Sequence, residues 1–167
     1  MSRTPGGAPP NYITPAGFAK LREEHRVLFE VERPKVVETI SWAAGNGDRS
    51  ENGDYIYGRK RLREIDKALN RLSSRMKDAV VVDPIAQPDK TRAFFGSTVT
   101  YVDEEDRERT VTIVGQDEAD ATAGRISWKS PIARSLNGAR VGDVRVVHLP
   151  GGAQEIEVLA IRYPAGA

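Results

Sequence analysis

The chain has 167 residues, of which 39% are hydrophobic and 29% are charged, and its formal net charge is +1. This composition predicts a globular protein of one domain or two small ones, and it excludes a largely disordered chain. The absence of cysteine excludes disulfides and thiolate metal sites, and it fits the reducing cytoplasm in which we expect the protein to act. No run of about 18 apolar residues occurs, so we expect no membrane-spanning helix and no membrane partner.

The first eleven residues are rich in Gly, Pro and Ala and contain no apolar stretch of signal-peptide length, so we expect residues 1–11 to form a flexible tail. A helix is predicted to start at Thr14 and Pro15, because Thr caps helices and Pro suits the first helical position. Apolar residues then recur near helical spacing as far as a Gly-Asn-Gly breaker at residues 45–47. Pro34 lies inside this helix and is expected to kink it or to open one turn.

A second helix is predicted to start between Asp48 and Glu51. Its apolar residues follow one another at steps of three and four: Leu62, Ile65, Leu69, Leu72 and Met76. Continued backwards, the same register reaches Gly58 and Tyr55. This heptad pattern predicts a coiled-coil partner, and the nearby segment of similar length is the first helix. We therefore expect residues 12–82 to form an antiparallel coiled-coil hairpin with its tip at residues 45–55.

The composition changes after Asp78. Residues 83–93 contain two prolines and are predicted to be a linker. Short segments separated by Gly, Asp and Pro are then predicted to be strands, at residues 97–102, 109–114, 125–128, 143–148 and 156–163, with a short helix at 131–136. The predicted fold class is α+β, in which the helical hairpin is followed by a second domain over residues 94–167.

Two acidic residues, Asp48 and Glu51, lie three residues apart at the predicted head of the second helix, where they can point to the same side. One interpretation is a capping box, which is the commoner arrangement for this spacing. The other is Mg²⁺ binding, because one or two carboxylates together with phosphates and waters commonly hold this ion. Two exposed carboxylates would bind it weakly alone, so the metal interpretation predicts a helper and not a free-standing nuclease. The two interpretations are compatible.

The two histidines, His25 and His148, are isolated, and no pair has zinc-ligand spacing. His25 lies at a seam position of the first helix, so partial burial is its expected role. There is no glycine-rich phosphate loop and no nucleophile elbow. The sequence therefore contains no sign of an independent catalytic site.

The second helix is strongly basic. Residues 58–78 hold eight basic and three acidic residues inside a nearly neutral chain. Those away from the apolar seam are predicted to form a stripe: Arg59, Lys60, Arg63, Lys67 and Arg71. A solvated coiled-coil face explains any one of them, but the excess as a set favours a polyanion nearby. The segment has no interleaved aromatic residues, so the pattern supports contact with the backbone of single-stranded RNA and not base stacking.

The segment from Gly47 to Asp66 resembles the tip and second helix of the GreB type in the Gre family of transcript cleavage factors. The resemblance rests on Gly-Asp-Arg-Ser-Glu-Asn-Gly-Asp-Tyr at residues 47–55 and on Lys-Arg-Leu-Arg-Glu-Ile-Asp at residues 60–66. Further similar segments are 32–34, 42–44, 94–96 and 130–134, so the resemblance extends over about residues 12–163. The GreA type diverges in the tip and in the helix that follows it.

This resemblance implies an N-terminal antiparallel coiled coil and a C-terminal FKBP-like domain with an antiparallel sheet. It implies that the protein binds bacterial RNA polymerase through its secondary channel and stimulates hydrolysis of the 3′ end of backtracked nascent RNA. Asp48 and Glu51 would help to hold a catalytic Mg²⁺ shared with the polymerase, and Ser50 would hydrogen-bond the water or a neighbouring carboxylate. The basic stripe would lie near the RNA, and Ser130 and Pro131 would contact the polymerase. The protein would then be no enzyme on its own, and we expect it to act as a monomer.

Two residues depart from the family pattern: Gly53 stands where Ala is usual, and Lys129 stands where GreB-type proteins usually have an acidic residue. Three other functions remain open. The first is a regulator that occupies the polymerase channel without stimulating cleavage, which substitution of both tip acids would distinguish. The second is a peptidyl-prolyl isomerase, suggested only by the FKBP-like fold and opposed by the lack of an aromatic pocket signature. The third is a coiled-coil adaptor.

Overall fold

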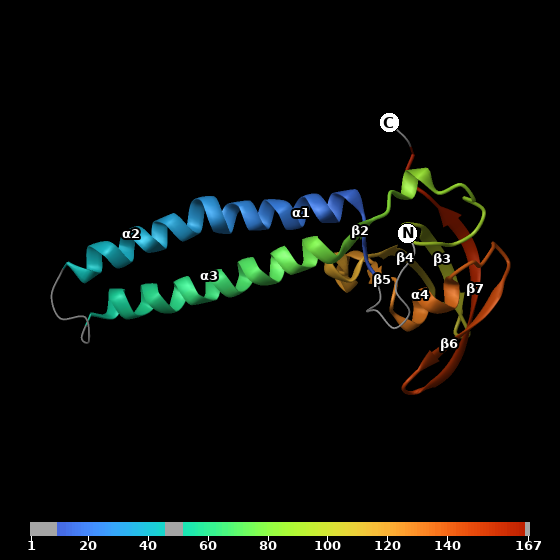
Figure 1. The fold of residues 1–167 in the computed structure, drawn as a ribbon. Helices are drawn as coiled ribbons and strands as arrows, with labels where there is room; N and C mark the ends of the chain where they lie inside the picture. The colour runs from blue at the N-terminus through green and yellow to red at the C-terminus, as the bar shows by residue number, and fades with distance from the viewer. Residues whose placement is uncertain (1–9, 46–51, 166–167) are drawn as a thin grey trace. The chain divides into compact units, whose positions relative to one another are not determined.

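The computed structural model describes residues 10–45 and 52–165. The chain divides into two compact units (Figure 1). Phe18–Asp78 forms a helical unit, and the segments before and after it, Met1–Gly17 and Ala79–Ala167, form a unit built on a β-sheet. None of the helices among the described residues is long and apolar enough to cross a membrane.

The helical unit is an antiparallel hairpin, as predicted. Its first arm runs from α1 (Pro15–Arg26) through a π-helical segment (Val27–Glu32) into α2 (Arg33–Ala44), and its second arm is α3 (Gly53–Asp78). The π-helical segment ends immediately before Pro34. Proline has no N–H and its ring clashes with the carbonyl four residues earlier, so the helix widens there, and Arg33 N donates to Leu28 O, five residues back. The expected opened turn is confirmed.

The seam between the two arms follows the predicted heptads. In α3 the buried residues are Gly58, Ile65, Leu69 and Leu72, whereas Leu62 and Met76 are only half-buried. Gly58 is a point of close approach, because a Cβ built on it would lie 2.7 Å from Ile40 Cγ1 on the opposite arm. The α3 helix begins at Gly53, a few residues later than predicted.

Polar pairs bridge the arms beside this seam. Arg33 Nε donates to Asp66 Oδ1 at 2.9 Å, and Arg61 Nη2 donates to Glu32 Oε2 at 3.0 Å. His25 is half-buried and its Nε2 lies 3.2 Å from Ser73 Oγ. The expected partial burial of His25 is therefore confirmed. The two ion pairs are about 40% exposed to solvent, which screens them, so we expect each to contribute little, about 0–1 kcal/mol.

The second unit is a five-stranded sheet with the strand order β5-β4-β3-β7-β6. The strands are β3 (Thr98–Asp103), β4 (Glu108–Val114), β5 (Arg125–Ser127), β6 (Val144–Leu149) and β7 (Gly152–Arg162). All neighbours are antiparallel except β4 and β5, which are parallel. The sheet is therefore mixed, because residues 115–124 carry the chain back through two short 3₁₀ turns before β5 begins.

One helix, α4 (Pro131–Leu136), packs on this sheet at the position predicted from the sequence. Ser130 caps it by accepting a hydrogen bond from Ala133 N at 3.3 Å. Leu136 is fully buried in a cluster with residues from four strands: Val99, Tyr101, Ile113, Val147, Ile156 and Val158. This small core holds the surfaces around α4 in place.

The chain segments that flank the hairpin belong to the sheet unit. A short parallel pair joins β1 (Asn11–Ile13) to β2 (Ala79–Val81). Glu118 accepts hydrogen bonds from Thr14 N at 3.0 Å and Gly115 N at 2.9 Å, and it also accepts one from Thr14 Oγ1. The expected tail and hairpin boundary at residues 11–12 thus differs from the observed division at Gly17 and Phe18.

The segment expected to be a linker, residues 83–93, also packs within the sheet unit. Pro84 and Ala93 are buried, and Ala93 N donates to Ala139 O at 2.8 Å. Tyr163 fastens the end of the segment, because its Oη donates to Arg92 O at 2.6 Å and accepts from Phe94 N at 3.0 Å. The segment is therefore an integral part of this unit, and the expected boundaries at 82–83 and 93–94 are not division points of the fold.

Candidate functional site

The three tip residues predicted to carry the chemistry, Asp48, Ser50 and Glu51, lie outside the described residues. The structure describes the two chain ends that hold this segment. Asn52 connects them, because its Nδ2 donates to Ala43 O at 2.7 Å and its Oδ1 accepts from Tyr55 N at 3.2 Å.

Asn52 thereby acts as the cap of α3 and fixes the start of α3 to the end of α2. The backbone N–H of Tyr55, in the first turn of α3, donates to this side chain. The sequence analysis gave a capping box of Asp48 and Glu51 as one of two compatible interpretations, and it did not consider Asn52. The available signal was an Asn directly before the helix, a strong cap residue in its own right.

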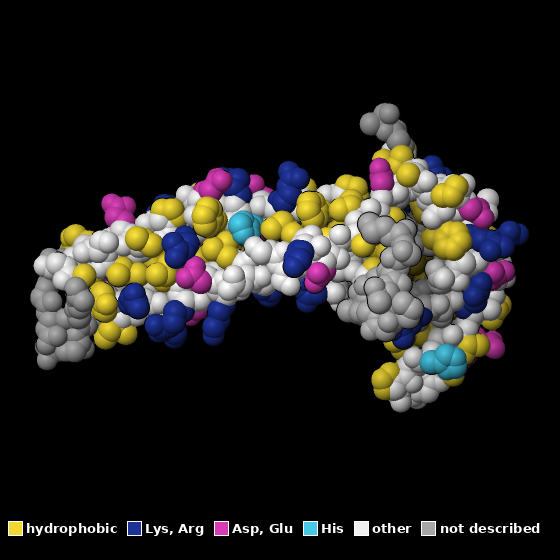
Figure 2. Space-filling view, in the orientation of Figure 1, with side chains coloured by type: hydrophobic (Ala, Val, Ile, Leu, Met, Phe, Trp, Pro, Cys, Tyr) yellow, Lys and Arg dark blue, Asp and Glu magenta, His cyan; other side chains and the backbone are white. Residues whose placement is uncertain are grey.

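The basic stripe on α3 is exposed along its length. Arg59, Lys60, Arg63, Lys67 and Arg71 are all exposed, and Figure 2 shows dark blue side chains distributed along the hairpin. Arg61 differs from them, because it pairs with Glu32 across the seam and with Glu64 on its own helix. The positive charge of the stripe is therefore accessible to a partner, whereas Arg61 links the two arms of the hairpin.

Two aromatic side chains near the tip that the sequence analysis did not single out are exposed. The exposed fraction is 62% for Trp42, near the end of α2, and 69% for Tyr57, near the start of α3. Both lie just outside residues 58–78, the basic segment that contains no interleaved aromatic residues. The missed signal is their position, since each directly precedes a buried seam residue and therefore points away from the core.

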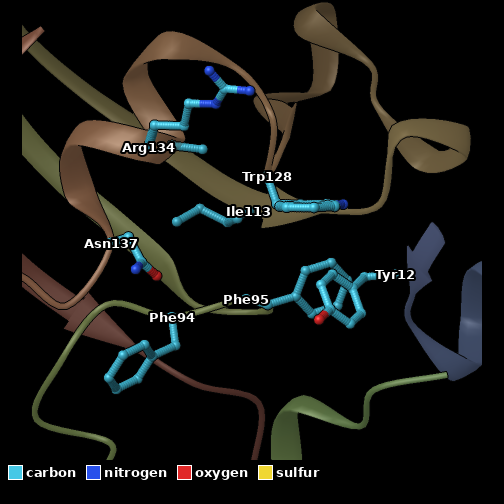
Figure 3. Close-up of a pocket in the computed structure, with 8 residues that line it drawn as sticks. Tyr12, Phe94, Phe95, Ile113, Trp128, Arg134 and Asn137 are labelled. Carbon is cyan, nitrogen blue, oxygen red and sulfur yellow. The ribbon is translucent and has the colours of Figure 1, made fainter. Parts of the chain in front are cut away.

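The sheet unit contains an aromatic pocket of about 340 Å³ that the sequence analysis did not foresee. Figure 3 shows Tyr12, Phe94, Phe95 and Trp128 around it. The rings of Tyr12 and Trp128 meet edge to face with centroids 4.9 Å apart, and those of Tyr12 and Phe95 are 6.0 Å apart. These residues come from three separate segments of the chain, so no local pattern revealed them. The predicted strands showed no signature of an aromatic pocket, yet the folded unit contains one.

The predicted docking residues lie beside this pocket. Ser130 and Pro131 begin α4, the helix whose Arg134 lines the pocket. Arg134 also lines a second hollow of about 300 Å³ with Pro131 and His148. Lys129 precedes them, and its Nζ lies 5.6 Å from the centroid of the Trp128 ring. The surface around α4, which we call the α4 face, therefore has two hollows, and Lys129 and Arg134 give it positive charge.

The described residues contain no group of three or more His, Asp or Glu side chains that could hold a metal ion.

Two family models match successive parts of this chain. "Transcription elongation factor, N-terminal" matches residues 11–81, and "Transcription elongation factor, GreA/GreB, C-term" matches residues 87–163. This chain belongs to the GreA/GreB family of transcription elongation factors. The two matches cover both units of the fold, so this GreA/GreB chain has the hairpin and the sheet unit of its family.

Curated members of the GreA/GreB family include similar proteins of both types. The chain is 51% identical to transcription elongation factor GreB of Neisseria meningitidis serogroup B over 153 residues, which are 92% of this chain and 94% of that protein. It is 42% identical to GreB of Yersinia pestis, over 92% of this chain and 89% of the relative. It is 40% identical to GreA of Alkalilimnicola ehrlichii, over 90% and 96% respectively. These identities agree with the GreB-type motifs at the tip.

Among solved structures, Gfh1 of Thermus thermophilus matches at 23% identity with a TM-score of 0.43, over 92% of this chain and 99% of that one.

Proposed function

We propose that this chain binds bacterial RNA polymerase through the secondary channel and stimulates hydrolytic cleavage of the 3′ end of backtracked RNA, so that arrested complexes resume elongation. The observation that supports this most strongly is a GreB-like acidic motif at residues 47–55, placed between the two arms of a hairpin in a chain of the GreA/GreB family. In this proposal the active site of the polymerase performs the hydrolysis, and the chain contributes its tip carboxylates to that site.

Asp48 and Glu51 would hold Mg²⁺ jointly with the polymerase. The donor set fits this ion, because Mg²⁺ prefers carboxylate oxygens and is commonly held by one or two of them with other ligands from its substrate. When bound, the ion stabilises charge on the attacking and leaving oxygens of the phosphoryl transfer. Ser50 lies between the two acids in sequence, and its hydroxyl would hydrogen-bond the attacking water or a neighbouring carboxylate.

The described part of the hairpin explains how the acids would be presented. The 26 residues of α3 rise about 39 Å at 1.5 Å per residue, which gives the arm its reach. The Asn52 hydrogen bonds to Ala43 and Tyr55 close the hairpin directly below the tip. These bonds fix the spacing between the end of α2 and the start of α3, the two points from which the tip segment extends.

The basic stripe would lie along the path of the extruded RNA. Its five exposed cations would attract the phosphate backbone regardless of sequence. The α4 face would dock on the polymerase, with Ser130 and Pro131 at the contact and the aromatic pocket available to an apolar side chain of the partner. Lys129 makes this face more basic than is usual for the GreB type, so an acidic contact surface is the complementary one.

The test is RNA cleavage in a stalled, backtracked elongation complex at fixed Mg²⁺. We expect the wild-type chain to shorten the RNA, and the Asp48→Ala/Glu51→Ala variant to bind the complex equally well without stimulating cleavage. A matched control is Glu38→Ala, which removes an exposed acid of the same hairpin away from the tip. If neither the wild type nor the double variant stimulates cleavage although both bind, the function is occupancy of the channel, and the proposal is wrong.

A further inference from the structure

Trp42 and Tyr57 are large aromatic side chains that the fold leaves in solvent. Their exposed fractions, 62% and 69%, are the highest among the large hydrophobic side chains of the described hairpin. Neither contributes to the buried seam, which Ala43 and Gly58 form at this end. Figure 2 shows hydrophobic side chains on the hairpin surface next to the undescribed segment, together with Lys and Arg side chains. Stability of the hairpin does not account for these rings.

The two rings project to the same side of the hairpin. Trp42 directly precedes the buried Ala43, and Tyr57 directly precedes the buried Gly58, so each is turned about 100° from the seam in the same sense. In an antiparallel pair of helices, equal turns from the seam lead to the same side. Arg61 supports this placement, because it lies four residues after Tyr57 and reaches Glu32 of the opposite arm at 3.0 Å.

Both rings also lie in the helical turns adjoining the tip. Trp42 is two residues from the end of α2, about 3 Å along the axis, and Tyr57 is four residues into α3, about 6 Å along the axis. An RNA strand that runs along the hairpin to the tip would pass these turns. Exposed cations follow Tyr57 on α3, and at about 100° per residue Lys60 is turned only about 60° from Tyr57 and Arg63 about 120°, whereas Arg59 lies on the opposite side.

We propose that Trp42 and Tyr57 form a stacking platform for the unpaired bases of the extruded RNA 3′ segment. The combination of exposed aromatic rings with a basic track is the arrangement that proteins use for single-stranded nucleic acids, because every base presents a π-face and every nucleotide a phosphate. An apolar wall of protein would match the rings but not the adjacent cations, so charge complementarity selects RNA as the occupant. This inference rests on the proposed function and adds that the factor reads the bases as well as the backbone.

The experiment compares two backtracked complexes of equal extruded length. In one the extruded nucleotides carry ordinary bases, and in the other they are abasic. The measured quantity is the apparent second-order rate constant of factor-stimulated cleavage, normalised to intrinsic cleavage of the same complex without factor. Four chains are tested: the wild type, Trp42→Ala/Tyr57→Ala, Trp42→Phe/Tyr57→Phe and Ile56→Ala. Ile56 is the matched control, because it is also exposed near the tip but has no ring.

For the wild type we expect the abasic complex to react about 5- to 100-fold more slowly, which corresponds to the stacking of one base. The double alanine variant should be slower on ordinary RNA by a similar factor and show no further loss on abasic RNA. The double phenylalanine variant should retain most of the base dependence, and Ile56→Ala should behave as the wild type.

Equal rates of the wild type on both complexes would overturn the inference while leaving the proposed function intact. So would an alanine variant that is slowed equally on both complexes and keeps the base dependence, because the rings would then contact polymerase protein. If the wild type stimulates cleavage of neither complex, the proposed function fails, and this inference fails with it.

Discussion

Gly58 is a point of close approach in the hairpin seam, and whether Gly58→Ala stabilises or destabilises the hairpin depends on one neighbour, Ile40. Substitution by Ala adds a methyl that would lie 2.7 Å from Ile40 Cγ1, closer than real contacts allow. Overpacking of this kind costs about 1–3 kcal/mol. Against this, Ala in a helix is favoured over Gly by about 0.5–1 kcal/mol. We therefore expect Gly58→Ala to destabilise the hairpin by about 1 kcal/mol.

The same substitution should become stabilising when Ile40 is replaced by Ala. The atoms closest to the added methyl all belong to Ile40, and without Cγ1 and Cδ1 the nearest that remains is Cβ at 4.0 Å, an ordinary contact. In the Ile40→Ala background we expect Gly58→Ala to stabilise by about 0.5–1 kcal/mol. Gly53→Ala is the control, because nothing lies within 4 Å of the added methyl. It should stabilise by up to about 1 kcal/mol in either background.

The measurement is urea unfolding followed by far-ultraviolet circular dichroism, which reports mainly the hairpin because α4 has only six residues. The decisive quantity is the change in the free energy of unfolding caused by Gly58→Ala in each background. If that change has the same sign and size with Ile40 and with Ala at position 40, Gly58 does not face Ile40 and the deduced seam register is wrong.

Three further substitutions test the sheet unit. Glu118→Ala removes a carboxylate that accepts three hydrogen bonds, so we expect it to lower the free energy of unfolding of this unit by about 2 kcal/mol, measured by urea unfolding followed by Trp fluorescence. A change below about 0.5 kcal/mol would contradict the role of Glu118 in fixing the start of α1. Tyr163→Phe leaves the N–H of Phe94 and the carbonyl of Arg92 without their hydrogen-bond partner, and it should lower the free energy of unfolding by about 1–3 kcal/mol in the same assay. An unchanged unfolding midpoint would show that other contacts hold residues 83–93. Hydrogen bonds from backbone N–H groups, chiefly that of Arg107, hold the pKa of Asp103 below its ordinary value, so its stabilising effect is present above about pH 4 and is lost as the pH falls through the lowered pKa. The thermal midpoint of Asp103→Asn should therefore lie below that of the wild type at pH 7 and approach it near pH 3, and a difference that persists in acid would refute the assignment.

Periodic features of the sequence predicted most of the fold. The heptad positions Ile65, Leu69 and Leu72 and the breaker at residues 45–47 sufficed for the hairpin, because seam burial depends on spacing along one helix. The Pro34 effect and the helix at 131–136 followed from local backbone chemistry. Membership of the GreA/GreB family agrees with the resemblance carried by residues 47–66.

Features that depend on contacts between distant segments were not predictable in this way. Tyr12 and Trp128 form one pocket although more than a hundred residues separate them, and nothing near either residue signals the other. The segment 83–93 was taken for a linker because of its prolines, yet Pro84 is buried. Pro84 packs against Gly96, where a Cβ would lie 2.5 Å from Pro84 Cβ, so the missing side chain permits the close approach. Composition indicates the local backbone preference of a segment, whereas contacts with distant segments decide whether it is buried.

The central claim is that the tip carboxylates donate to a Mg²⁺ shared with the polymerase, and its most direct test is the Mg²⁺ dependence of single-turnover cleavage in a backtracked complex. Wild-type chain is compared with Glu51→Gln at saturating factor, so that binding to the polymerase is not limiting. The account predicts that Glu51→Gln needs a clearly higher Mg²⁺ concentration for half-maximal cleavage, because an amide oxygen is a weaker ligand than a carboxylate. Identical Mg²⁺ curves for the two chains would contradict it.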